Sequence, residues 1–96
     1  MAFFPMMIRL EDKPVLVIGA GEEGTKKIKI LHEFGCIITL IALRAEREAE
    51  ALANEILYRS FTDSDIADNY VCIVAATDDK RLNRRISDLA SERKIP

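Results

Sequence analysis

The sequence has very few of the side chains from which metal sites and disulfide frameworks are built. Its 96 residues include one histidine and two cysteines. His32 lies in a predicted helix without a partner in a ligand pattern, which argues against a metal site and against a Ser-His-Asp arrangement. Cys36 and Cys72 have neither C-x-x-C spacing nor a histidine nearby, so we predict that both are buried structural thiols.

The sequence also lacks an excess of one charge and a long apolar run. The net charge is −2 and the basic residues are spread along the chain, which gives no footprint for nucleic acid or an acidic membrane surface. Lys26, Lys27 and Lys29 form a cluster that is predicted to be a solvated helix face. The apolar segment 1–8 is too short to span a bilayer and has no signal-peptide features. We expect a cytoplasmic protein without nucleic-acid or membrane partners.

Apolar runs alternate with amphipathic segments, and no linker, repeat or low-complexity stretch separates them. Continuous apolar runs are typical of central strands covered on both faces, and apolar residues at helical spacing indicate helices. Residues 1–96 are therefore expected to form one domain. Strands are predicted at residues 14–18, 37–42, 56–59 and 70–75, and helices at residues 25–34, 45–54 and 80–93.

A glycine-rich turn follows the first predicted strand. Residues 19–24 read G-A-G-E-E-G, and the amphipathic segment that begins at Thr25 comes directly after them. Between a strand and a helix, G-x-G-x-x-G is the fingerprint of dinucleotide binding. Gly21 lets the backbone approach a pyrophosphate, Gly24 lets the helix pack on the strand, and the first helical turn offers free N–H groups to the anion.

Two other interpretations of these glycines are considered. The glycines could simply make a tight strand-to-helix turn that binds no ligand. Alternatively, Gly19 and Gly24 have the separation found in the phosphate-binding motif G-x-x-x-x-G-K-[ST]. Here, however, Thr25 precedes Lys26, which reverses the required order, and the two glutamates between the glycines would repel a triphosphate. The sequence therefore argues against a nucleoside triphosphatase.

The order of the elements predicts an α/β fold. We expect a Rossmann-like, doubly wound parallel sheet with strand order 3-2-1-4, truncated after the fourth strand and its helix. Ligands bind such sheets at the carboxyl ends of the strands, where the order reverses between the first and fourth strands. The strand at residues 70–75 would have an open edge, and exposed edges pair with other chains. A homo-oligomer is therefore expected.

A second loop reaches the same end of the predicted sheet. Ala76-Thr77-Asp78-Asp79 follows the fourth strand, and its hydroxyl and carboxylates can either cap the next helix or contact a bound nucleotide. Threonine and aspartate are common caps whatever the function of a protein. Both roles therefore remain open at this point.

One element of the dinucleotide fingerprint is missing. An acidic residue about 20 positions after the glycines normally binds the ribose 2′-hydroxyl. Here the second strand ends in Ala42-Leu43-Arg44, and Glu46 comes slightly late. Arg44 suits the 2′-phosphate of NADP, or it lines the adenine side of the site. This position leaves the choice between NAD and NADP open.

Several segments carry a family resemblance, and the most specific is A-A-T-D-D at residues 75–79 with Leu82 and Asn83. The other matching segments are residues 4–6 leading to Leu10, residues 15–21, Lys27 and Leu31 ahead of Gly35, residues 38–42 and residues 93–96. Together they resemble the N-terminal domain of siroheme synthase and the stand-alone precorrin-2 dehydrogenases. The resemblance covers essentially the whole chain.

The resemblance implies an NAD-dependent enzyme that oxidises precorrin-2 to sirohydrochlorin, and several members of the family also insert ferrous iron to give siroheme. It implies that NAD lies along the glycine turn, with its adenosine half near the end of the second strand. The family also lacks an acidic residue after that strand. Neither a catalytic residue nor a metal ligand is predicted in the chain. With the second loop included, the predicted cofactor-binding residues are Gly19, Gly21, Glu22, Glu23, Gly24, Leu43, Arg44, Ala76, Thr77 and Asp78.

The chain departs from the family pattern in two ways. The family usually has alanine where this chain has Gly24, a small-for-small change expected to leave the helix packing intact. The family's catalytic aspartate lies on an N-V-V-D-like strand, and this chain stops at Pro96, just before it, without the helical region that serves dimerisation and tetrapyrrole binding. We therefore expect the chain to bind NAD but to be inactive alone towards its tetrapyrrole substrate. The alternative is a stand-alone NAD(H) sensor or subunit without catalysis.

Overall fold

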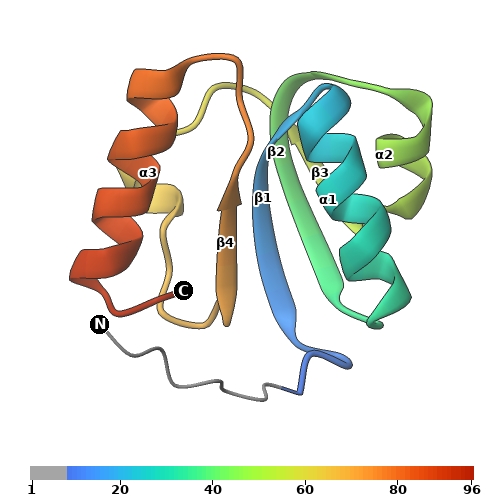
Figure 1. Ribbon diagram of the computed structural model, residues 1–96, viewed down its shortest axis with the longest axis horizontal. Coiled ribbons are helices and arrows are strands. Elements are labelled where there is room, and N and C mark those ends of the chain that lie inside the picture. Colours follow the sequence, from blue (N-terminus) through green and yellow to red (C-terminus); the bar gives the residue numbers. More distant parts are fainter. Residues whose placement is uncertain (1–8) are drawn as a thin grey trace, which may run out of the picture.

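The computed structural model describes residues 9–96, so the apolar segment 1–8 and its matches to the family lie outside the described residues. The described residues form a four-stranded parallel sheet (Figure 1). Its strands are β1 (Pro14–Ala20), β2 (Ile37–Ala45), β3 (Glu55–Tyr58) and β4 (Cys72–Ala75), in the order β3-β2-β1-β4. This arrangement confirms the predicted strand order and the Rossmann-like fold.

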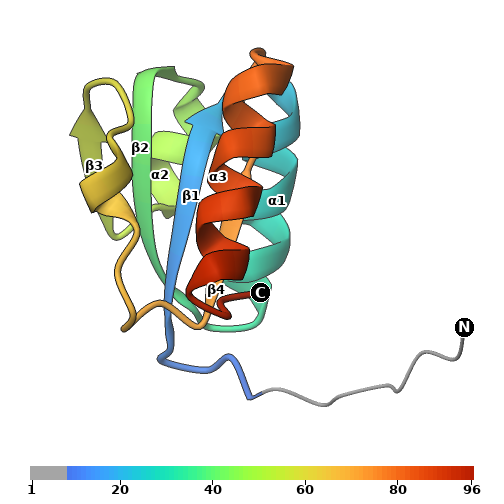
Figure 2. The same cartoon turned by 90° about the vertical axis from the view of Figure 1, so that its left-hand side faces the viewer.

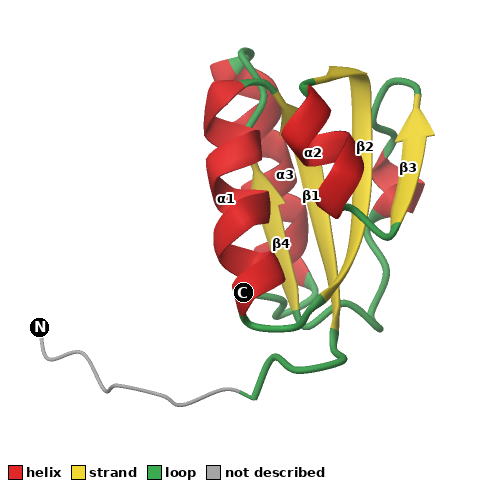
Figure 3. Ribbon diagram, turned by 90° about the vertical axis from the view of Figure 1, so that its right-hand side faces the viewer, coloured by secondary structure: helices red, strands yellow, loops and turns green. Residues whose placement is uncertain are grey.

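Helices cover both faces of the sheet. Helices α1 (Glu22–Glu33) and α2 (Arg47–Leu52) lie on one face, and α3 (Lys80–Glu92) lies on the other (Figures 2 and 3). Because side chains alternate along a strand, Val15 and Val17 of β1 face α1 while Leu16 and Ile18 face α3. All four are buried, which explains why β1 reads as one continuous apolar run.

Several boundaries differ from those predicted by periodicity. Helix α1 begins at Glu22, three residues before Thr25, because its two leading glutamates carry no apolar signal although they suit a helix N-terminus. Strands β1 and β2 extend beyond their predicted carboxyl ends at residues 18 and 42, to Ala20 and Ala45. Helix α2 is shorter than the predicted residues 45–54. The helix stop at Gly35 is confirmed by its positive φ of 75°.

The connection from β3 to β4 has no α-helix. It contains a single 3₁₀ turn, η1 (Asp63–Asp65), and buries Ile66 against the α3 face of the sheet. Arg59 binds Asp65 through two hydrogen bonds of 2.6 and 2.8 Å, which hold the pKa of this carboxyl below its usual range. Arg85 of α3 forms an ion pair with Asp63, so the connection is attached to the helix beside it.

The rarer side chains lie largely as predicted. Cys36 is buried, whereas Cys72 is only half-buried because β4 is the edge strand of the sheet. Burial raises the pKa of both thiols. The three clustered lysines of α1 are exposed, which confirms their solvated face. Residues 9–96 contain no cluster of three or more potential metal ligands, and none of their helices is long and apolar enough to cross a membrane.

Candidate nucleotide-binding cleft

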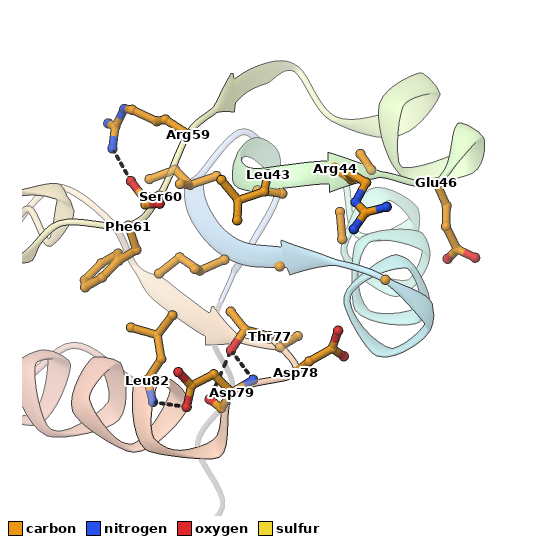
Figure 4. Close-up of a pocket in the computed structure, with 18 residues that line it drawn as sticks. Leu43, Arg44, Glu46, Arg59, Ser60, Phe61, Thr77, Asp78, Asp79 and Leu82 are labelled. Carbon is orange, nitrogen blue, oxygen red and sulfur yellow. Dashed lines mark hydrogen bonds between the residues drawn. The ribbon is translucent and has the colours of Figure 1, made fainter.

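A cleft of about 700 Å³ lies at the carboxyl ends of the strands (Figure 4). The glycine turn after β1, the end of β2, the segment after β3 and the loop between β4 and α3 all contribute to its lining. The sheet order reverses at this end, between β1 and β4, so the cleft occupies the position expected for a ligand site.

The three glycines of the turn have different local surroundings. Gly19 has a φ of 101°, and a Cβ atom there would lie 2.4 Å from the Ala76 carbonyl oxygen. A Cβ atom at Gly24 would lie 2.0 Å from the Gly19 carbonyl oxygen. At Gly21, by contrast, a Cβ atom would meet nothing within 4 Å. Packing therefore requires glycine at positions 19 and 24 but not at position 21, which faces open space.

Helix α1 packs very closely on the turn at Gly24. An added Cβ at this position would collide with backbone atoms of Gly19 rather than with the end of a flexible side chain. The helix approaches the turn so closely here that even one methyl group requires the backbone to move. The glycine of this chain thus allows α1 to pack closely on the turn.

Helix α1 presents an uncapped N-terminus beside the cleft. Gly21 is its N-cap residue and has no side chain to accept a hydrogen bond, and the helical bond from Thr25 N–H to the Gly21 carbonyl measures 2.9 Å. The preceding N–H groups of the first turn therefore have no partner within the helix. Glu22 and Glu23 point into solvent, where both pair with Lys26 at 3.6 and 3.5 Å. Like Gly24, they do not line the cleft.

The carboxyl end of β2 forms another wall. Leu43 is 73% exposed, although it is a large apolar side chain. Arg44 and Glu46 lie nearby and also line the cleft (Figure 4). Within residues 9–96, Arg44 forms no ion pair, and the Glu46 N–H donates to the Ala20 carbonyl at 3.2 Å. This wall thus offers an apolar surface and one free guanidinium group.

In the loop from Ala76 to Asp79, different residues serve the two roles considered above, which are capping α3 and contacting a ligand. Asp79 is the N-cap of α3 and accepts hydrogen bonds from the N–H groups of Arg81 and Leu82 at 2.9 and 3.2 Å. Asp78 points away from α3, forms no side-chain hydrogen bond among the described residues, and lines the cleft (Figure 4). Capping therefore belongs to Asp79, while Ala76, Thr77 and Asp78 face the space where a ligand would lie.

Sequence reasoning missed the wall that follows β3. Arg59, Ser60 and Phe61 line the cleft, and Arg59 is fixed there by its bonds to Asp65. The short edge strand and the absence of a helix after it left no periodic pattern to mark this segment. The available signal was its position, because the carboxyl end of every parallel strand reaches the same edge of the sheet.

The lining suits an extended ligand that combines apolar ring surface with polar groups. Apolar surface comes from Leu43, Phe61 and Leu82, and the N-cap residue of the uncapped helix α1, Gly21, also belongs to the lining. Among the described residues the lining contains no histidine, cysteine or lysine. The arrangement can bind and orient a nucleotide, but its side chains do not form a nucleophile and base pair.

Comparisons with known proteins agree with this geometry. A family model described as "Putative NAD(P)-binding" matches residues 6–96. The chain is 40% identical to siroheme synthase of Thioalkalivibrio sulfidiphilus and 38% identical to that of Ectopseudomonas mendocina, in each case over 100% of this chain. It covers only 20% and 21% of those two proteins. Among solved structures, the precorrin-2 dehydrogenase SirC matches with a TM-score of 0.68 and 25% identity, over 98% of this chain and 45% of SirC.

Proposed function

Because this chain belongs to the NAD(P)-binding family whose model matches residues 6–96, we propose that it is the NAD-binding domain of a precorrin-2 dehydrogenase. NAD, when bound, would supply the hydride acceptor for the oxidation of precorrin-2 to sirohydrochlorin, while the accompanying proton would go to a base. The role of this chain is to bind the dinucleotide and to orient it. Its similarity to siroheme synthases and to SirC supports the tetrapyrrole substrate.

The observation that carries the proposal is the bare backbone at Gly21. Its φ of −80° lies outside the left-handed region that favours glycine, and an added Cβ would touch nothing in the protein. The fold therefore does not require glycine at this position. A pyrophosphate against the start of α1 does require it, because the phosphate oxygens must approach the backbone closely.

The same geometry argues against the two other interpretations of the glycines. A purely structural turn explains Gly19 and Gly24 but leaves Gly21 unexplained. A triphosphate-binding loop needs a lysine that reaches the phosphates, whereas the Lys26 ammonium group is held among the glutamates on the solvent side of α1.

We propose NAD rather than NADP as the cofactor. Arg44 could bind a 2′-phosphate, but the carboxylates of Glu46, Asp78 and Asp79 line the same cleft, and Arg59 is already paired with Asp65. One free guanidinium group among three carboxylates is a poor environment for the 2′-phosphate, which gives NADP its additional negative charge. The resemblance to NAD-dependent relatives points in the same direction.

Two further parts of the proposal concern partners and location. Strand β4 is at the edge of the sheet with all four residues half-buried, which supports self-association through this edge. The Pro96 carbonyl already accepts a 2.9 Å hydrogen bond from the Ile73 N–H there, so a partner would pair with the rest of the strand. The even spread of charge supports a cytoplasmic protein that binds neither nucleic acid nor membranes.

The binding site is tested by calorimetric titration of the chain with NAD and, separately, with NADP. We expect saturable NAD binding that is lost in Gly21→Asp, whose carboxylate would occupy the pyrophosphate position. Ser87→Asp, which adds the same charge on the exposed side of α3, is the matched control and should bind like the unaltered chain. Failure of the unaltered chain to bind either dinucleotide would refute the proposal, and tighter binding of NADP would refute the choice of NAD.

The assignment to precorrin-2 oxidation needs a separate test. The chain replaces the matching N-terminal fifth of the Thioalkalivibrio siroheme synthase, and NAD-dependent formation of sirohydrochlorin is followed by absorbance. We expect activity in this chimera and its loss when the chimera carries Gly21→Asp. A folded chimera that binds NAD but forms no sirohydrochlorin would refute the substrate and leave the cofactor site intact.

A further inference from the structure

Asn83 belongs to the most specific segment of the sequence, but cofactor binding by itself gives it no role. It lies in the first turn of α3, and its side-chain amide reaches back to the loop before the helix. The Asn83 Oδ1 atom accepts from the Thr77 N–H at 3.0 Å and from the Thr77 hydroxyl at 2.5 Å. Its Nδ2 atom donates to the Thr77 carbonyl at 2.9 Å. All three polar groups of Thr77 are therefore bound by one side chain.

These bonds are not needed to start the helix. Asp79 already caps α3 through two backbone N–H groups, and the Asn83 N–H makes an ordinary helical bond of 3.0 Å to the Asp79 carbonyl. The Asn83 side chain binds only the loop and not the helix terminus. Together with the weaker bonds between the Thr77 hydroxyl and the Asp79 backbone, at 3.1 and 3.2 Å, its bonds hold the loop relative to α3.

The position of this loop determines the shape of the cleft. Ala76 is bound to β1 by a 2.8 Å hydrogen bond from its N–H to the Ile18 carbonyl. Its own carbonyl oxygen lies so close to Gly19 that there is no room for a Cβ atom between the two backbones. The next two residues, Thr77 and Asp78, form the wall opposite Leu43 and Arg44 (Figure 4). A loop released from α3 would thus move against the glycine turn or into the cleft.

We propose that Asn83 is a positioning residue for dinucleotide binding, because its side-chain amide holds the Ala76–Asp78 wall at the separation from the glycine turn that admits the ligand. Asn83 does not line the cleft and acts through Thr77. The inference rests on the proposed function, since it concerns the same site.

The test measures NAD affinity and unfolding separately in three variants of the chain. Asn83→Ala removes the three hydrogen bonds between Asn83 and Thr77 and leaves those between the Thr77 hydroxyl and the Asp79 backbone. Asn83→Asp keeps the acceptor but loses the donor to the Thr77 carbonyl. Leu89→Ala is the control, because Leu89 packs in the same helix almost three turns from the loop and its loss lowers stability without touching the cleft. Titrations are performed at a temperature at which unfolding curves show every variant to be folded.

We expect Asn83→Ala to weaken NAD binding about tenfold, as the loss of an interaction to a partly buried polar group predicts. Leu89→Ala should bind NAD like the unaltered chain although it unfolds more easily. Asn83→Asp should bind about tenfold more weakly at neutral pH and approach the unaltered chain as the pH falls to about 4. A protonated carboxyl group can again donate to the Thr77 carbonyl, so acid should restore the lost bond.

Each outcome separates the inference from the proposed function. If the unaltered chain binds NAD and Asn83→Ala binds it as tightly as Leu89→Ala does, Asn83 is only structural and the inference is wrong. If Asn83→Asp loses the same NAD affinity at every pH, the inference is also overturned, because the hydrogen bond donated to the Thr77 carbonyl would then play no part in binding. If the unaltered chain binds neither NAD nor NADP, the proposed function fails and the inference fails with it.

Discussion

Exchanging glycine for alanine at two positions three residues apart in the same turn should have opposite consequences. At Gly24, the new methyl carbon would lie 2.0 Å from the Gly19 carbonyl oxygen and 2.7 Å from the carbonyl carbon. Ordinary contact begins at 3.4 Å, so α1 and the turn must separate by more than an ångström. At Gly21 the same methyl carbon would enter open space, and the φ of −80° lies outside the left-handed region that favours glycine.

The expected magnitudes follow from these distances. Overpacking against backbone atoms should lower the free energy of unfolding of Gly24→Ala by about 3 kcal/mol. The higher helix propensity of alanine should raise it by about 1 kcal/mol. The net loss of about 2 kcal/mol corresponds to a Tm lower by about 10 °C in a domain of this size. For Gly21→Ala, the small loss of a favourable N-cap residue and the lower entropy of the unfolded chain nearly cancel, and the change stays within about 0.5 kcal/mol.

Thermal and urea unfolding followed by far-ultraviolet circular dichroism measures both variants directly, and titration with NAD then measures the site. Gly24→Ala should lose stability, whereas Gly21→Ala should keep its stability and bind NAD more weakly. Equal unfolding curves for Gly24→Ala and the unaltered chain would refute the reasoning, because the backbone contact would then be readily relaxed. Unchanged NAD affinity in Gly21→Ala would show that the bare backbone at this position serves no ligand.

Two further predictions concern carboxylates. Arginine partners hold the pKa values of Asp63 and Asp65 below the usual range, so the stabilisation from these pairs is present above about pH 4 and is lost as the pH falls below it. Urea unfolding should therefore show that these pairs cause no pH dependence of stability between about pH 5 and pH 8 and a loss of stability at lower pH. Replacement of Asp79 by alanine removes the cap of α3 and should cost about 1 kcal/mol in the same assay, whereas Asp78→Ala, which removes no hydrogen bond, should leave the unfolding curve unchanged.

The sequence was sufficient to predict the sheet and the glycine turn because each depends on local signals. Buried parallel strands must be apolar on both faces, and Val15–Ile18 satisfies this requirement without interruption. A left-handed backbone position such as Gly19 leaves little choice of residue. The order of strands then follows from the alternation of strands and helices along the chain.

Other parts of the cleft depend on contacts between distant residues, which no local pattern records. Phe61 lies in the lining because the ion pairs of Arg59 with Asp65 and of Asp63 with Arg85 hold its segment against α3. The start of α1 was placed too late because hydrophobic periodicity cannot detect two leading glutamates. The lack of room for a Cβ atom at Gly24 could not be predicted either, since it depends on how closely the backbones of Gly24 and Gly19 approach in space.

The contact between Gly19 and Ala76 has a thermodynamic consequence for any ligand of the cleft. Two turns that are far apart in the sequence meet backbone to backbone, and each is also tied to the sheet, so the floor of the cleft is assembled before a ligand arrives. A ligand that binds there need not order a loop, and little conformational entropy is lost on association. Affinity can then arise from few direct contacts, and association need not wait for the cleft to form.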